Sequence, residues 1–343
     1  MSSERQTSEG NAAGNASILA TLNKQETIGS DVNPRNGDQN PYGLDVAKAT
    51  QGNITAGDLV VCDFNAASNI QGTGNSILAL HPVVGSKPIS VIGNPQFLTG
   101  CNAIAMSPLG DVWAVAFGSN DAPIVSGNGQ VVTPLKNPVW HHPFGEAFVP
   151  PVNAHSVPAF YVSNAGDGSL VRIAITQSGF KFIVIATGFP VNGGVPGSIL
   201  GPSGLNYVAA NDRLYIVDGT NNTLYAINNV SRITANGIAV HGLTFSGPFA
   251  SSAKVIFTGA PLNGPISSAI LANGNIAVGN TLDPAGTNLI VEISPTGQFL
   301  AKKNVDTGAP GAIFGMVATG NSAATQRLYY NNDNDNTLRV LHQ

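Results

Sequence analysis

Two adjacent histidines and a nearby glutamate form the most chemically promising group in the sequence. His141 and His142 stand in the segment VWHHPFGE, which also contains Glu146. Two imidazoles and a carboxylate could bind zinc, copper or iron, and one imidazole could serve as a general base. Neighbouring residues of a strand point to opposite sides, so both imidazoles reach one ion only if the backbone turns between them, as Pro143 would allow. The alternative is that these histidines only make loop hydrogen bonds beside Trp140.

A second group consists of Asn and Asp residues placed where strands are expected to end. Their oxygen atoms suit hard cations such as calcium or magnesium, so a central ion held by a few of them is chemically reasonable. The same residue types are also standard in tight hairpins, because they bond nearby backbone and tolerate left-handed conformations. The hairpin interpretation is the favoured one. The residues are Asp63, Asn65, Asn120, Asp121, Asn164, Asp167, Asp218, Asn221, Asn280 and residues 331–336.

The composition indicates that many short strands position these residues. Hydrophobic residues make up 43% of the 343 residues, and charged residues only 10%. Forty Gly and 22 Pro supply turns for many connections. With a net charge of −4 and only 15 Lys plus Arg, the chain offers no basic surface for nucleic acid. No apolar run approaches the length of a membrane span.

A repeated unit of strands defines the expected fold. The best copy, over residues 201–227, reads GPSGLNYVAANDRLYIVDGTNNTLYAI, with three strands separated by turn residues. Five further copies begin near Pro41, Asn102, Pro143, Pro265 and Ala312. The copies lie about 40 to 60 residues apart, which is the size of a propeller blade. The sequence therefore predicts an all-β, six-bladed β-propeller with four-stranded antiparallel blades.

The last copy lacks a fourth strand, because the chain ends at Gln343. The only apolar run before the first blade is ASILATL at residues 16–22. Pairing this run with the last blade would close the ring and remove two exposed edges. We therefore expect residues 1–14 to form a disordered leader and residues 15–343 to form a single domain. Closed edges also favour a monomer.

The topology predicts where a ligand would bind. One face of a propeller collects the loops that enter each first strand and the loops that join second strands to third strands. We call this the loop face. A small molecule or a protein partner is expected to bind there, around the central channel.

The copies at residues 211–227 and 327–341 resemble NHL repeats, with a Pro-x-Gly strand followed by a strand of the form G-x-L-Y-V-A-D. This resemblance covers nearly the whole chain from Pro41 and implies a propeller, whereas members of the class differ widely in function. Similar gluconolactonase-like propellers hold a divalent ion with a Glu and with Asn or Asp residues from separate blades. By resemblance, the matching positions are Glu146, Asn164, Asn206 and Asp218.

Cys62 and Cys101 are expected to lie near the same face of adjacent blades. A disulfide between them is geometrically possible and would suit an exported protein, periplasmic or extracellular. The alternative, which the sequence favours equally, is that both cysteines are buried as free thiols. Low Lys content with abundant Asn, Thr and Gly also resembles exported bacterial proteins, whose leader this sequence would lack.

Two hypotheses follow for the function. The first is an NHL-like propeller that binds a ligand or partner at the channel. The second is a metal-dependent enzyme, a lactonase-like hydrolase or a lyase, with one divalent ion (calcium, magnesium, zinc or another transition metal) at the channel mouth and His141, His142 and Glu146 handling protons.

Overall fold

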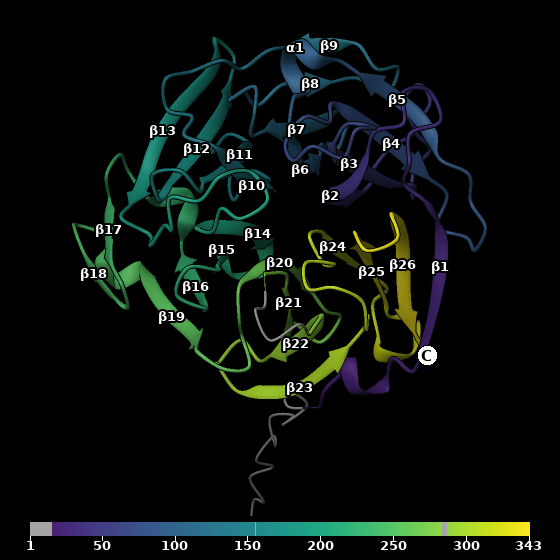
Figure 1. Cartoon of the computed structure of the whole chain (residues 1–343). Coiled ribbons are helices and arrows are strands. Elements are labelled where there is room, and N and C mark those ends of the chain that lie inside the picture. Colours follow the sequence, from purple (N-terminus) through teal and green to yellow (C-terminus); the bar gives the residue numbers. More distant parts are fainter. Residues whose placement is uncertain (1–15, 155, 283–286) are drawn as a thin grey trace, which may run out of the picture.

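The computed structural model describes residues 16–154, 156–282 and 287–343. Its strands form six sheets arranged around a central axis, as the sequence predicts (Figure 1). The predicted leader at residues 1–14 lies outside the described residues. No helix in the described ranges is both long and apolar enough to cross a membrane.

Four blades follow directly from the sequence repeats, each with its strands in chain order from the inside outwards. Blade one comprises β2 (Gln39–Val46), β3 (Leu59–Asn65), β4 (Ser76–Leu80) and β5 (Ile89–Gly93). Blade two comprises β6 (Cys101–Met106), β7 (Val112–Ala116), β8 (Ile124–Val125) and β9 (Val131–Thr133), and the short helix α1 (Pro95–Leu98) precedes it. Blade three comprises β10 (Pro143–Val149), β11 (Ala159–Asn164), β12 (Ser169–Thr176) and β13 (Gly179–Thr187). Blade five comprises β20 (Pro265–Ile270), β21 (Ile276–Asn280), β22 (Leu289–Ile293) and β23 (Phe299–Asn304).

Blade four contains an insertion before its outer strand. It comprises β14 (Pro202–Val208), β15 (Arg213–Asp218), β16 (Thr223–Asn228) and β19 (Ala253–Thr258), with the 3₁₀ helices η2 (Ala209–Asn211), η3 (Val230–Arg232) and η4 (Ala250–Ser252) in its connections. The inserted hairpin of β17 (Ile238–His241) and β18 (Thr244–Ser246) joins blade three instead, because β17 pairs in parallel with β13.

Blade six combines the two ends of the described chain. It comprises β24 (Met316–Thr319), β25 (Arg327–Asn332) and β26 (Thr337–His342), with the 3₁₀ helix η5 (Ala323–Thr325), and its outer strand is β1 (Lys24–Ser30). The register joins Lys24 to His342 and Gly29 to Leu338. A closing strand from the N-terminal region is thus confirmed.

The position of that closing strand differs from the prediction. The apolar run at residues 16–22 does not pair with blade six, and part of it forms the 3₁₀ helix η1 (Leu19–Thr21). Ile18, Leu19 and Leu22 are buried in a cluster with residues of blades five and six. The run is apolar because it covers this core, whereas β1 is an outer strand and can be largely polar and exposed.

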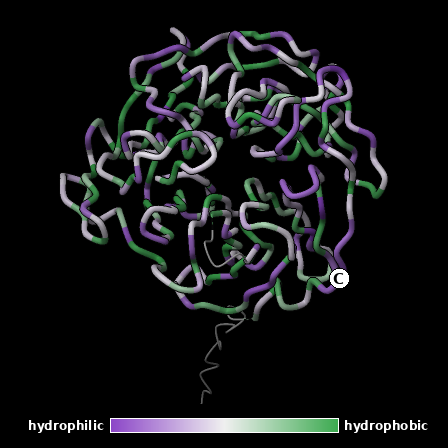
Figure 2. Tube along the Cα trace, viewed as in Figure 1, coloured by the Kyte–Doolittle hydropathy of each residue, from purple (hydrophilic) through white to green (hydrophobic). Residues whose placement is uncertain are grey.

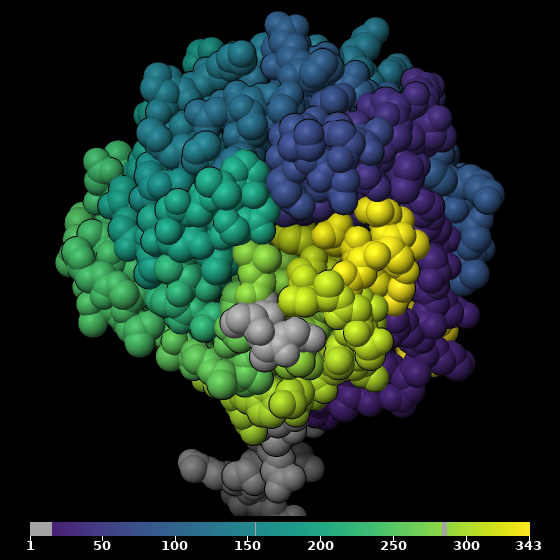
Figure 3. Space-filling model, in the orientation of Figure 1, coloured from purple at the N-terminus to yellow at the C-terminus, as the bar shows by residue number. Residues whose placement is uncertain are grey.

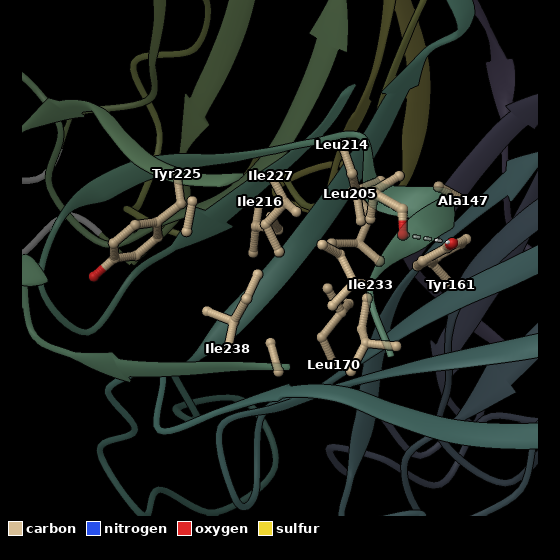
Figure 4. Packing of buried hydrophobic residues seen from close by; sticks show 14 of the residues in the cluster. Ala147, Tyr161, Leu170, Leu205, Leu214, Ile216, Tyr225, Ile227, Ile233 and Ile238 are labelled. Atoms are coloured by element: carbon tan, nitrogen blue, oxygen red, sulfur yellow. Dashed lines mark hydrogen bonds between the residues drawn. The ribbon is translucent and has the colours of Figure 1, made fainter. Parts of the chain in front are cut away.

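The hydrophobic core is divided among the contacts between blades. Apolar residues therefore occur all around the ring (Figure 2). Between blades three and four, Tyr161, Leu170, Leu205 and Ile216 point toward one another (Figure 4). Between blades one and two, Cys62 and Cys101 form a disulfide, which confirms the first of the two alternatives. Each blade is thus held by the side chains of its neighbours.

Inner strands approach one another closely where small residues occur. At Gly145, an added Cβ would lie only 1.8 Å from the carbonyl oxygen of Ser203 in blade four. The hydroxyl of Ser163 donates a hydrogen bond to the same oxygen, at 2.9 Å. The inner strands of blades three and four are thus packed directly against each other at this point.

Candidate functional site

Six side chains, one from each inner strand, form a ring around the channel. Each lies one residue after the small residue at which neighbouring inner strands approach closely, as Glu146 follows Gly145, so the six occupy equivalent positions in the blades. We call them the waist ring, because they line both a small cavity of about 70 Å³ on the side of the loop face and a pocket of about 480 Å³ on the other side. The waist ring consists of Leu44, Ile104, Glu146, Leu205, Ser268 and Met316.

Aromatic side chains fill the channel between the waist ring and the loop face. The ring of Tyr42 stacks on Phe64 and on Phe314, with centroids 4.1 Å and 3.7 Å apart. Phe144 and Phe117 belong to the same buried cluster. Because these rings occupy the loop-face end of the channel, little space is left there for a ligand.

Two long connections cover this aromatic cluster at the loop face. One joins β3 to β4 in blade one, and the other joins blade three to blade four. They meet at Gly72, where an added Cβ would lie 3.1 Å from Cβ of Pro196. Ile199 of the second connection packs into the aromatic cluster. Figure 3 looks onto this face and shows atoms of several blades meeting over the axis.

The larger pocket lies at the opposite end of the channel, where the inner strands finish. We call it the channel pocket. Its polar residues are Asp45, Lys48, Glu146, Asn206, Tyr207 and Ser268, and its apolar lining includes Leu44, Ile104, Met106, Phe148, Leu205 and Met316. Since the Lys48 side chain is 48% exposed, solvent reaches the rim of this pocket.

Glu146 is the only ionisable member of the waist ring. It is 7% exposed, and neither of its carboxyl oxygens has a hydrogen-bond partner. Burial raises the pKa of this carboxyl well above its usual value, and the charge of Asp45 raises it further. This shift favours the protonated form of Glu146, which can donate a hydrogen bond into the channel.

The other polar groups of the channel pocket already have partners. One Asp45 oxygen accepts a hydrogen bond from the Met106 amide at 2.7 Å, and the other lies 3.3 Å from Lys48 Nζ. The Asn206 side-chain nitrogen donates to the carbonyl and the hydroxyl oxygen of Ser268, both at 2.8 Å. These bonds fix the walls of the pocket and leave Glu146 as its unpartnered group.

The structure places the two histidines on the loop face, on the blade-three side. The ring of His142 stacks on Phe117 at 4.2 Å, and its backbone has a left-handed φ of 53°. His141 Nε2 lies 3.7 Å from an Asp167 oxygen, and both side chains are substantially exposed. The backbone does turn between the histidines, but Glu146 faces the channel beyond the aromatic cluster.

Asn164 and Asp218 are the last residues of β11 and β15, next to the turns that follow these strands. Asn164 accepts a hydrogen bond from the His141 amide at 3.2 Å and donates to Val139 O and Ser169 Oγ. Asp218 accepts from the Thr220 amide at 2.9 Å, and burial raises its pKa to about 7. Of the sequence-predicted ligands, only Glu146 and Asn206 line one pocket. The described ranges contain no group of three or more His, Cys, Asp or Glu side chains arranged to hold a metal ion.

Sequence reasoning did not select Asp45 and Lys48 as site residues. The signal was present, because Asp45 occupies in β2 the position that Asn206 occupies in β14. Lys48 lies beyond the end of the inner strand β2, so its position does not correspond to a position in the sequence repeats. The members of the waist ring could have been predicted from the sequence, because each one directly follows the small residue of an inner strand in the repeats.

The fold and its closed ring define this protein as a six-bladed β-propeller. No family model matches the chain, and no curated protein matches it. The NHL resemblance therefore stays a prediction from the repeated motifs.

Solved structures support the assignment of the fold. A gluconolactonase from Xanthomonas campestris is similar with a TM-score of 0.63 at 13% identity, over 96% of this chain and 94% of that chain. Virginiamycin B lyase from Staphylococcus aureus is similar with a TM-score of 0.55 at 14% identity, over 93% of this chain and 98% of that chain. At these identities the likeness shows the fold alone.

Proposed function

We propose that this propeller binds a small neutral molecule in the channel pocket, with protonated Glu146 as the hydrogen-bonding anchor at its floor. The supporting observation is a buried carboxyl with two unpartnered oxygens, surrounded by the apolar side chains of the waist ring. A buried polar group without a partner is costly, and a ligand that supplies the partner recovers that cost.

The chemistry of the pocket restricts the ligand. A protonated carboxyl both donates and accepts, so it can form two hydrogen bonds with an amide or lactam group. Ile104, Leu205 and Met316 would surround an apolar body, and the pocket volume is that of ordinary small-molecule sites. The ligand class is therefore a compact, mostly apolar molecule with one amide-like end.

Caprolactam is a suitable probe, because it combines an apolar ring with a lactam. We expect crystals soaked in caprolactam to show it in the channel pocket, with its amide on Glu146. Calorimetry should detect binding to the unmodified protein and to Glu146→Gln, which keeps a donor and an acceptor, but not to Glu146→Leu. Absence of the probe from the pocket, or undiminished binding to Glu146→Leu, would contradict the proposal.

The second hypothesis, a metal-dependent lactonase-like hydrolase or lyase, has a separate test. It requires that His141, His142 or Glu146 help to hold an ion. Elemental analysis of dialysed protein should then find stoichiometric metal that is lost in His141→Ala, His142→Ala or Glu146→Ala. No specific contact of the described residues favours this hypothesis over ligand binding.

Export and a monomeric state belong to the same proposal. The disulfide supports export, because such bonds persist in oxidising compartments. Thiol labelling of the protein from fractionated native cells should find Cys62 and Cys101 oxidised outside the cytoplasm. Light scattering should give the mass of one chain.

A further inference from the structure

The contact between blade six and blade one contains buried acidic side chains, and we call this contact the seam. Asp31 directly follows β1, the outer strand of blade six, and its amide donates to Asn336 O at 3.1 Å. Asp63 lies near the end of β3 in blade one, opposite Pro41 of the inner strand. Both side chains are fully buried. The ring is thus closed beside two carboxyl groups.

These carboxyl groups have no hydrogen-bond partners. All four oxygens of Asp31 and Asp63 are buried and unpartnered, and the side-chain oxygen of Asn40 is in the same condition. The backbone amide of Asn40 donates a hydrogen bond to Asn336 Oδ1 at 2.9 Å. This bond fixes the position of Asn40 at the seam. Five oxygen atoms therefore lie at the seam without a partner.

Other carboxyl groups near the seam raise the pKa values of both acids. Burial, together with the charges of Asp333 and Asp335, raises the pKa of Asp31 to about 8. Burial also raises the pKa of Asp63, and Asp31 and Asp38 add to this effect. Asp38 is hydrogen-bonded to Ser76 Oγ at 2.7 Å, whereas Arg339 pairs with Asp335 and lies 3.9 Å from Asp306. Among residues 16–154, 156–282 and 287–343, no Lys, Arg or His side chain forms an ion pair with Asp31 or Asp63.

We propose that the seam binds a calcium ion, with Asp31, Asp63 and the side-chain oxygen of Asn40 as ligands. Calcium takes six to eight oxygen ligands in flexible geometry, and backbone oxygens or water can complete such a set. Each proton could provide one O–H donor to a neighbouring oxygen and would leave further oxygens unpartnered, whereas one divalent ion can contact both carboxylates and the Asn40 oxygen at once. The ion would join the last blade to the first and hold the ring closed. This site is separate from the channel pocket and does not depend on the proposed function.

Calcium binding can be measured on the full chain after treatment with a chelator. We expect one binding event by calorimetry with calcium chloride, weaker binding with magnesium chloride, and a higher unfolding temperature in calcium. Since the carboxyls must lose protons to bind the ion, calorimetry in buffers of different ionisation enthalpy should show proton release. No heat and no change in unfolding temperature would overturn the proposal.

Two isosteric variants and one control test the residues. Asp31→Asn and Asp63→Asn should each weaken calcium binding by at least about tenfold, because each removes a charged ligand. Asp121→Asn is the matched control, since Asp121 is also fully buried but accepts hydrogen bonds from the amides of Ala122 and Leu135. The control should keep the calcium response. Undiminished binding in both seam variants would overturn the proposal.

A further measurement does not depend on the variants. Crystals of the unmodified protein soaked in terbium chloride, whose ion replaces calcium, should show an anomalous peak between Asp31 and Asp63. A peak only elsewhere would overturn the assignment. In the presence of chelator, Asp31→Asn should unfold at a temperature no lower than that of the unmodified protein at pH 8, because it removes a buried acid that has no counterion.

Discussion

The aromatic ring of Tyr42 in blade one stacks on that of Phe314, which lies just before the inner strand of blade six, with centroids 3.7 Å apart and an interplanar angle of 14°. This contact joins the first and last blades at the axis of the molecule. It also places Tyr42 between Phe314 and Phe64 in the channel. The aromatic cluster therefore both closes the loop-face end of the channel and stabilises the ring.

Replacing Tyr42 should be costly for this reason. We expect Tyr42→Ala to lower the free energy of unfolding by about 3–5 kcal/mol, because it removes a large buried ring and leaves a cavity. Urea denaturation would measure the change. Tyr42→Phe keeps both stacking contacts and should stay within about 1 kcal/mol of the unmodified protein. A similar loss in both variants would show that the hydroxyl, and not the stacking, matters.

The disulfide should contribute to stability through the unfolded state. Cys62 and Cys101 are 39 residues apart, and a crosslink over such a loop is worth about 2–4 kcal/mol. Both cysteines are fully buried, so a reductant reaches them only after unfolding. We expect the unfolding temperature to fall when dithiothreitol is present. The double variant Cys62→Ser with Cys101→Ser should have the lower unfolding temperature even without dithiothreitol, and adding dithiothreitol should not change it.

The carboxyl of Glu292 in blade five should anchor the segment that precedes β1. Its oxygens accept hydrogen bonds from Ser17 Oγ and from the amides of Ile18 and Leu19. We expect Glu292→Gln to lower the free energy of unfolding by about 2–3 kcal/mol, because the amide nitrogen would face donors. Amide hydrogen exchange should accelerate around Leu19. Glu26→Gln alters an exposed residue of β1 and should change stability by less than about 0.5 kcal/mol.

Stability should depend on pH in an unusual direction when no divalent cation is present. Burial raises the pKa of Asp31 to about 8 and those of Asp218 and Asp333 to about 7. The folded protein therefore holds more protons than the unfolded chain between pH 4 and pH 8, and rising pH favours unfolding. Urea denaturation in chelator at pH 5 and pH 8 should find the protein less stable at pH 8.

Asp218→Asn provides the control for this pH dependence. The variant cannot ionise at this position, so its loss of stability between pH 5 and pH 8 should be smaller than that of the unmodified protein. An unmodified protein that becomes more stable over this range would contradict the expected titration of the buried acids.

The fold was predictable from the sequence because its signal is repeated. Each blade carries turn residues and short apolar strands at similar spacing, so errors in one copy are corrected by the others. The outer strand β1 lacked this support, because an exposed edge position needs few apolar residues and only Ile28 and Gly29 are buried in it. The inserted hairpin of β17 and β18 occurs once and also escaped prediction.

The candidate site was predictable only in part. Glu146 was identified because it stands inside a repeated inner strand, which fixes its direction. The closure of the loop face was not visible, because it depends on Gly72 and Pro196, which come from connections of different blades and meet across the axis. Such contacts leave no periodic pattern in the sequence. The burial of Asp31 and Asp63 at the seam could not be inferred for the same reason.

The pairing of Lys24 with His342 also has a consequence during protein synthesis. The strand β1 is translated before all six inner strands but has no sheet to join until β26 has been translated. Throughout elongation, five blades can assemble while both edges of the incomplete ring stay open. The final event of folding is then the capture of β1 by β26, and a ribosome that stalls before this point releases a chain with two edges available for aggregation.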